Sequence, residues 1–77
     1  MKIRRNFDGL NKRAYESRRN AHMSQAALSE KSGVSIPQIK NIESGKSTPH
    51  DSTLELLSEA LNVSVDYLKY GGEDVQT

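Results

Sequence analysis

Three helix starts in this chain share one sequence signature, which constrains the fold more than any other feature. In each, an apolar residue precedes a serine, and a second apolar residue follows four positions after the serine. A serine hydroxyl at a helix start accepts a hydrogen bond from an otherwise unpaired backbone N–H, and the two apolar side chains pack together across that start. The three instances are Met23, Ser24 and Leu28; Val34, Ser35 and Ile39; and Val63, Ser64 and Leu68. We therefore expect a short helix to begin after each of these serines.

Two further helices are predicted from the spacing of apolar or small residues. Intervals of three and four positions place side chains on one face of a helix. The two stripes with this spacing are Leu10, Ala14, Ser17 and Ala21, and Leu54, Leu57 and Leu61. Between the helices, Gly45 is placed to end the preceding helix in a left-handed conformation. The sequence thus predicts an all-α fold.

A length of 77 residues accommodates one small domain. We expect residues 1–9 to form a basic N-terminal arm, residues 10–70 the folded domain and residues 71–77 a polar C-terminal tail. No stretch of the chain has the roughly 18 consecutive apolar residues that a membrane-spanning helix needs, and charges interrupt the N-terminal region. We therefore expect a cytoplasmic protein without a membrane partner.

The composition argues against an enzyme or a metalloprotein. The chain has no cysteine, which excludes disulfides and thiolate ligands. Its two histidines, His22 and His50, fall in different predicted elements, which is unfavourable for a metal site. The sequence shows neither a carboxylate pair with a pocket nor a glycine-rich phosphate loop. We expect no catalytic residues, no metal and no cofactor.

The net charge of +1 hides an asymmetry along the chain. Residues 1–31 hold eight Lys or Arg against three acids, whereas residues 51–77 hold one Lys against six acids. A basic front and an acidic back suit a protein that presents one face to a polyanion. Chance clustering of solvated charges is the alternative that charge alone leaves open.

Residues 24–43 combine two of the capped helices with a tight turn at Gly33. This spacing allows the second helix to lie in a DNA major groove while the first crosses above it. The segments SQAALSEKSGVSIPQIKNIESGKSTP and LELLSEALNVSVDYL resemble the Cro/CI-type (Xre) helix-turn-helix family of phage repressors and small bacterial regulators. The resemblance runs from about Leu10 to Tyr70. It implies a compact five-helix bundle, a lambda-repressor-like DNA-binding domain over residues 10–70.

The resemblance also implies structural roles for several residues. It pairs Arg18 on the first helix with Glu43 at the end of the recognition helix, and a phosphate contact by Arg18 is the alternative. Four positions depart from the family pattern. Ser29 replaces an alanine and Ser32 replaces an apolar residue, so each hydroxyl needs a partner. His22 replaces a glycine and is expected to tolerate a positive φ, and Asp51 replaces an apolar residue and is interpreted as a helix cap.

The predicted recognition helix, at about residues 35–43, has a buried and an outward face. Its outward arc consists of Ile36, Pro37, Lys40 and Asn41, with Gln38 flanking it. Ile36 and Pro37 are expected to contact thymine methyl groups. Lys40 is expected to reach a guanine or a phosphate, and Asn41 an adenine edge unless it stays in solvent.

Residues beside this helix are also candidates for DNA binding. Gln25 matches a family glutamine that contacts a phosphate and braces the recognition helix, and a solvated amide is the alternative. Ser35, which caps the recognition helix, belongs to the candidate set. Lys46, Ser47 and the loop amides around them resemble the backbone-clamping loop of the family, which implies phosphate contacts there.

Together these features favour a sequence-specific, double-stranded DNA-binding transcriptional regulator of the repressor type. One short helix reads too few bases for useful discrimination, so we expect a homodimer on a palindromic operator. Val65, Tyr67 and Tyr70 offer apolar surface for that dimer, unless they only cap the core. The alternatives are the antitoxin of a toxin–antitoxin pair, with a toxin as partner, and a protein-interaction adaptor built on the same bundle.

Overall fold

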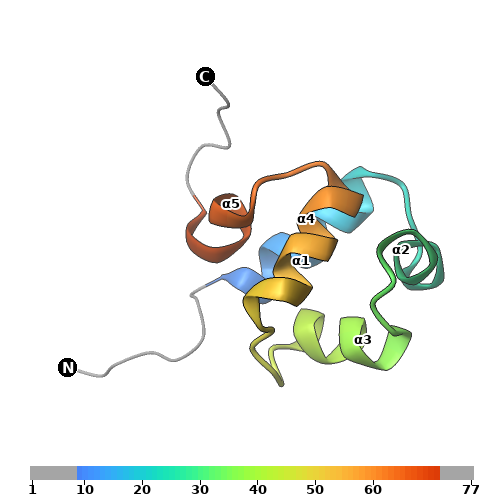
Figure 1. Ribbon diagram of the computed structural model, residues 1–77, viewed down its shortest axis with the longest axis horizontal. Coiled ribbons are helices and arrows are strands. Elements are labelled where there is room, and N and C mark those ends of the chain that lie inside the picture. Colours follow the sequence, from blue (N-terminus) through green and yellow to red (C-terminus); the bar gives the residue numbers. More distant parts are fainter. Residues whose placement is uncertain (1–8, 72–77) are drawn as a thin grey trace.

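Five α-helices make up most of the described chain in the computed structural model, which describes residues 9–71. They are α1 (Leu10–Asn20), α2 (Gln25–Ser32), α3 (Ile36–Ser44), α4 (Asp51–Leu61) and α5 (Val65–Tyr70). No strand occurs within residues 9–71, and the all-α, five-helix prediction is confirmed (Figure 1). Except for Gly9 and Gly71, the predicted arm and tail lie outside the described residues.

The three predicted serine caps are confirmed. Ser24 Oγ accepts a hydrogen bond from the backbone N–H of Ala27 at 3.0 Å, which caps α2. Ser35 Oγ accepts from the N–H of Gln38 at 3.2 Å at the start of α3. Ser64 Oγ accepts from the N–H of Tyr67 at 2.9 Å at the start of α5. Each bond satisfies one of the orphan donors of a helix start.

The start of α4 differs from the other capped starts. His50 occupies the cap position, and its side chain makes no capping hydrogen bond. The prediction that Asp51 caps this helix is wrong, because Asp51 is already the first helical residue. Its carboxylate instead forms an ion pair with Lys69 on α5, with 3.2 Å between Oδ1 and Nζ.

Left-handed residues end the first four helices and turn the chain sharply. His22 adopts φ 60°, as expected from its place in the family pattern, and Asn62 adopts φ 61°. Gly33 and Gly45 have φ values of 85° and 83°. A Cβ at Gly33 would meet no heavy atom within 4 Å. Backbone conformation, rather than lack of space, therefore favours glycine in the α2–α3 turn.

The core is a cluster of aliphatic side chains contributed by all five helices and by Val34. Its fully buried large members are Leu28, Ile39, Ile42, Leu54, Leu57 and Leu68. The predicted stripe of α1 is buried at Leu10, Ala14 and Ser17, but Ala21 is exposed because it lies just past the last helical residue. The buried Ser32 hydroxyl finds its expected partner, accepting from the N–H of Val34 at 3.1 Å.

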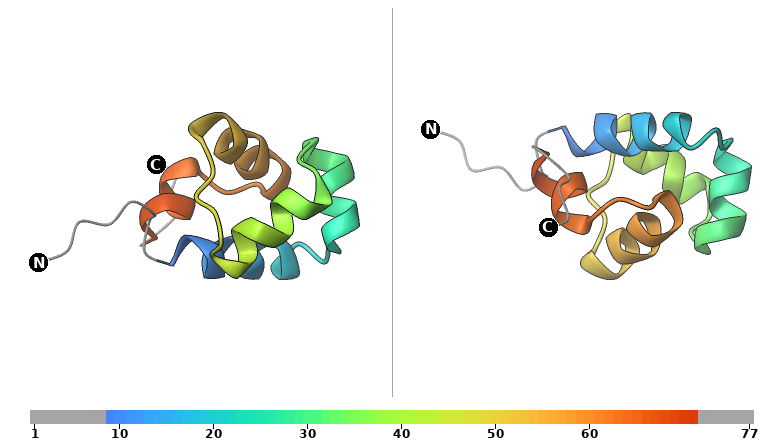
Figure 2. Two further views of the ribbon diagram at one scale, coloured as in Figure 1. Left: turned by 90° about the horizontal axis from the view of Figure 1, so that it is seen from below. Right: turned by 90° about the horizontal axis from the view of Figure 1, so that it is seen from above.

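The arrangement of the helices leaves α3 on an open face of the molecule. α3 packs against both α1 and α2, whereas α4 packs against α2 and α5. Seen from below, α3 crosses the near face, with α1 behind it and to one side (Figure 2). The outer face of α3 is therefore accessible, while its inner face closes the core.

Candidate nucleic-acid interface

The predicted division of α3 into two faces is confirmed. Ile39 and Ile42 are 1% and 2% exposed and belong to the core. The exposed residues of the outward arc are Pro37, Gln38, Lys40 and Asn41. Ile36 is half-buried, so only part of its side chain is available to a ligand. The DNA contacts assigned to these side chains stay predictions.

The first turn of α3 is organised by its own side chains. Ser35 Oγ acts as an acceptor in the cap, which leaves its O–H proton available as a donor. Pro37 lies where its missing N–H has no consequence for the helix. A phosphate contact by Ser35 is therefore compatible with its role as a cap.

A buried ion pair fixes the other end of α3. Arg18 donates from Nε to Glu43 Oε2 at 2.8 Å and from Nη2 to Oε1 at 3.1 Å. A third donor, Nη1, reaches the carbonyl of Met23 at 2.9 Å. The side chains of Arg18 and Glu43 are 9% and 7% exposed. The hydrogen bond to Glu43 raises the pKa of Arg18, although desolvation by burial opposes the shift. The predicted structural pairing is thus confirmed.

Gln25 joins the same carboxylate from the start of α2. Its Nε2 donates to Glu43 Oε1 at 3.0 Å. Glu43 therefore connects the end of α3 to α1 and α2 at once, which fixes the angle between the two helices of the turn. The bracing role implied for Gln25 is confirmed, and its phosphate contact stays a prediction.

Two residues of α1 next to this network were missed by sequence reasoning. The ring of Tyr15 lies under the guanidinium groups of Arg18 and Arg19, with 5.3 Å and 5.6 Å from ring centroid to Cζ. Arg19 Nη1 also donates to the Tyr15 hydroxyl at 2.6 Å. The only signal in the sequence is a tyrosine four residues before an arginine, a spacing that brings side chains together on a helix.

The loop after α3 differs in one respect from the expectation. The backbone N–H groups of Lys46 and Ser47 both donate to the carbonyl of Asn41, at 2.9 Å and 3.3 Å. These amides close the end of α3 in a Schellman-type turn with Gly45. The idea that they clamp a phosphate is therefore not supported, and only the exposed side chains of Lys46 and Ser47 remain candidates.

Charge is distributed unevenly over the helices. α4 and α5 carry four acids, Asp51, Glu55, Glu59 and Asp66, and one cation, Lys69, which pairs with Asp51. On α1, α3 and the following loop, Arg19, Lys40 and Lys46 are exposed, and no described carboxylate forms an ion pair with them. The face that carries α3 is thus the more attractive one for a polyanion.

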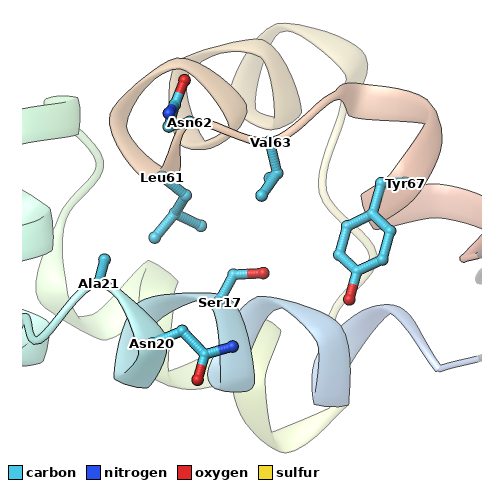
Figure 3. Close-up of a pocket in the computed structure, with 7 residues that line it drawn as sticks. All are labelled: Ser17, Asn20, Ala21, Leu61, Asn62, Val63 and Tyr67. Carbon is cyan, nitrogen blue, oxygen red and sulfur yellow. The ribbon is translucent and has the colours of Figure 1, made fainter. Parts of the chain in front are cut away.

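An open pocket of about 460 Å³ lies apart from this face. It is lined by Ser17, Asn20, Ala21, Leu61, Asn62, Val63 and Tyr67. Figure 3 shows Ser17 facing Leu61 and Val63 across the space between α1 and the α4–α5 connection. No lining residue comes from α2 or α3. The pocket is therefore not part of the candidate interface.

A capped second helix, set by a tight turn against the first and exposing a polar outer face, defines a helix-turn-helix protein. The chain belongs to the helix-turn-helix family, whose profile matches residues 15–68. It is of the Cro/CI (Xre) type that the sequence predicts. The fold and the family are those of DNA-binding transcriptional regulators.

Solved and curated relatives agree with this assignment. The P22 c2 repressor protein, solved in complex with synthetic operator 9T in the presence of Tl+, matches with a TM-score of 0.78 and 35% identity. The match covers 82% of this chain and 96% of that one. Two uncharacterized HTH-type transcriptional regulators of Mycobacterium tuberculosis, from strains CDC 1551 / Oshkosh and ATCC 25618 / H37Rv, are 39% identical over 51 residues. That is 66% of this chain but only 36% of each relative.

Among the helices of residues 9–71, none has the length and apolar character that a membrane crossing requires.

Proposed function

We propose that this chain binds double-stranded DNA sequence-specifically, with α3 in the major groove, as the DNA-binding part of a repressor-like transcriptional regulator. The proposal rests on one observation, that α3 is fixed at its end and exposes polar side chains on its outer face. Its end is fixed by the Glu43 network, while Lys40 and Asn41 project outward. A rigid helix with an outward polar face is what direct readout of base edges needs.

The division of labour follows from the chemistry of each side chain. Asn41 pairs with an adenine edge, and Ile36 and Pro37 meet thymine methyl groups. Lys40 contacts a guanine or a phosphate, and Gln38 flanks the outward arc that these four residues form. The P22 c2 repressor, seen with an operator, supports a DNA ligand for this fold.

Backbone phosphates are held by residues around α3. They are Gln25, Ser35, Lys46 and Ser47, each acting through its side chain. These contacts set the position of the domain on the duplex and are the same at every sequence.

A homodimer on a palindromic operator completes the proposal, because a single short helix discriminates too little. The interface involves α5 and differs in detail from the sequence expectation. Val65 and Tyr67 pack against the core, whereas Tyr70 is 67% exposed. Tyr70→Asp should therefore weaken the dimer and leave the fold intact, which sedimentation and circular dichroism would show together.

Selection from a random duplex library tests the function directly. An enriched palindrome with half-site centres about 10 base pairs apart is the expected result. Recovery of no enriched site, with no binding to random duplex at low salt, would contradict DNA binding. That outcome would favour the adaptor. The antitoxin alternative keeps the DNA site and adds a toxin that co-purifies with the chain.

A further inference from the structure

We propose that Arg19 binds a backbone phosphate of double-stranded DNA on the flank of the α3 interface, and that Tyr15 is the positioning residue that holds Arg19 there. The inference rests on the proposed DNA-binding function and deepens it. It extends the interface from α3 and its loop onto the outer surface of α1.

A continuous set of contacts leads from α3 to these residues. Glu43 at the end of α3 holds Arg18, and the Tyr15 ring lies 5.3 Å from Arg18 Cζ. On the same ring lies Arg19, whose Nη1 donates to the Tyr15 hydroxyl at 2.6 Å. Tyr15 and Arg19 are thus linked through Arg18 to Glu43, the residue that fixes the end of α3. Tyr15 is 40% exposed, and Arg19 is also exposed.

The charge of Arg19 is not neutralised by the described part of the protein. The charge of Arg18 is matched by Glu43. Arg19, in contrast, has no carboxylate partner within residues 9–71. A guanidinium has five N–H donors, and the Tyr15 hydroxyl engages one of them. The remaining donors can bind a phosphate, for which the planar fork of arginine is well suited.

Tyr15 makes this arginine a better phosphate ligand than a free one. A long side chain loses rotamer freedom when it binds, and that loss weakens the contact. The ring and hydroxyl of Tyr15 already restrain the Arg19 side chain in the unbound protein. The alternative role is a helix-stabilising pair with no ligand, since residues four apart on a helix commonly interact.

The position of α1 relative to α3 determines where along the duplex Arg19 contacts the DNA backbone. α1 packs against α3, and in the view from below it lies behind α3 and to one side of it (Figure 2). A duplex lying on α3 therefore passes α1 on one flank, outside the bases that α3 reads. The contact should be independent of base sequence.

The first test compares two charge-matched variants, Arg19→Gln and Lys31→Gln. Lys31 is an exposed lysine in the last turn of α2 and has no assigned role in the interface. Binding to the selected site and to a random duplex is measured over a range of salt concentrations. Arg19→Gln should reduce the log–log salt slope by about 0.9 and weaken both duplexes by roughly tenfold. Lys31→Gln should leave the slope close to that of the unmodified protein.

The second test asks whether Tyr15 acts through Arg19. Tyr15→Phe keeps the ring and removes the hydroxyl. It should weaken binding by about threefold in the unmodified protein and have no further effect in an Arg19→Gln background. A purely structural pair would lower the melting temperature and leave the salt slope unchanged.

The outcomes separate this inference from the proposed function. If the unmodified protein binds DNA and Arg19→Gln behaves like Lys31→Gln, the phosphate contact is overturned while the function stands. If Tyr15→Phe weakens binding equally in both backgrounds, the positioning role of Tyr15 is overturned. If the unmodified protein binds no duplex, the proposed function fails and this inference fails with it.

Discussion

Helices α3 and α4 follow each other in the sequence but are held in place differently. α3 starts under the side-chain cap of Ser35 and ends at Glu43, whose carboxylate is bonded to side chains of α1 and α2. α4 starts at His50 without a side-chain cap, and its first residue, Asp51, meets a lysine at the surface. α3 is thus fixed at both ends by side-chain hydrogen bonds, whereas α4 has no side-chain cap at its start and ends in backbone hydrogen bonds at Asn62 and Val63.

The outward faces of α3 and α4 also differ in the charge of their exposed side chains. The exposed part of α3 before its last turn carries no acid and consists of Pro37, Gln38, Lys40 and Asn41. The exposed part of α4 is Asp51, Ser52, Glu55, Leu56 and Glu59. A polyanion would be repelled by the second face and accepted by the first. Of these two helices, the one fixed by side-chain hydrogen bonds at both ends is therefore also the one suited to a DNA ligand.

The largest predicted effect comes from breaking the fixed end of α3. Glu43→Ala leaves the Arg18 guanidinium buried without its partner, which should cost about 3 kcal/mol of unfolding free energy. It also frees Gln25, so the angle between α2 and α3 is no longer fixed. Binding to specific and random duplexes should weaken alike. Denaturant titration and duplex binding measure the two effects.

Glu43→Gln is the matched control for that change. It keeps the size of the side chain and one acceptor oxygen but removes the charge, so its effect should be smaller in both measurements. Selective loss of one base preference in either variant would show that Glu43 touches bases, which contradicts a purely structural role.

The second prediction tests how base contacts and phosphate contacts are divided between α3 and the loop after it. Asn41→Ala should cost roughly 1 to 3 kcal/mol of binding free energy on the selected site and far less on random duplex. Lys46→Ala should weaken both duplexes similarly and reduce the salt slope by about one unit. A phosphate is the same at every sequence, whereas an amide contact needs the right base. Equal losses for the two variants on every duplex would argue against base readout.

Much of this fold could be predicted because its determinants are local. A serine cap, or the periodicity of a leucine stripe, depends on residues within one or two turns, so all five helices were expected. The positive φ of His22 was implied by the family resemblance, because a glycine is usual at this position. The pairing of Arg18 with Glu43 was implied by family resemblance, not by local pattern, since 25 positions separate the two residues.

The features that sequence reasoning missed depend on the exact residue at which a helix starts or ends, or on tertiary geometry. Asp51 has the chemistry of a cap, but the chain enters α4 one residue earlier, and the carboxylate reaches Lys69 instead. The amides of Lys46 and Ser47 are bonded to the carbonyl of Asn41 at the end of α3, because the chain turns back at Gly45. Tyr15 and its arginines matter only because α1 lies beside α3, which no local pattern reveals.

The third prediction concerns a substitution that should stabilise the start of α4, which has no side-chain cap. The cap residue His50 has φ −72° and ψ 163°, close to the −66° and 154° of Ser35. A serine at position 50 would therefore present its oxygen to the first turn as Ser35 does. His50→Ser should raise the unfolding free energy by about 1 kcal/mol. A thermal melt with no increase would show that the start of α4 is already satisfied in another way.

The smallest predicted effect concerns the surface ion pair of α4. Asp51→Asn removes the negative charge that pairs with Lys69, whose pKa is raised chiefly by its hydrogen bond to Asp51. The Asp51 side chain is 75% exposed, so water and salt screen the pair. The melting temperature should fall by about 2 °C or less at low salt, and the difference should vanish near 1 M salt, where the screening length is about 3 Å. The loss in Glu43→Gln should persist at that salt concentration, because its ion pair is buried and poorly screened. A salt-insensitive loss in Asp51→Asn would mean that Asp51 stabilises α4 through a buried contact, which would remove the contrast between the two helices.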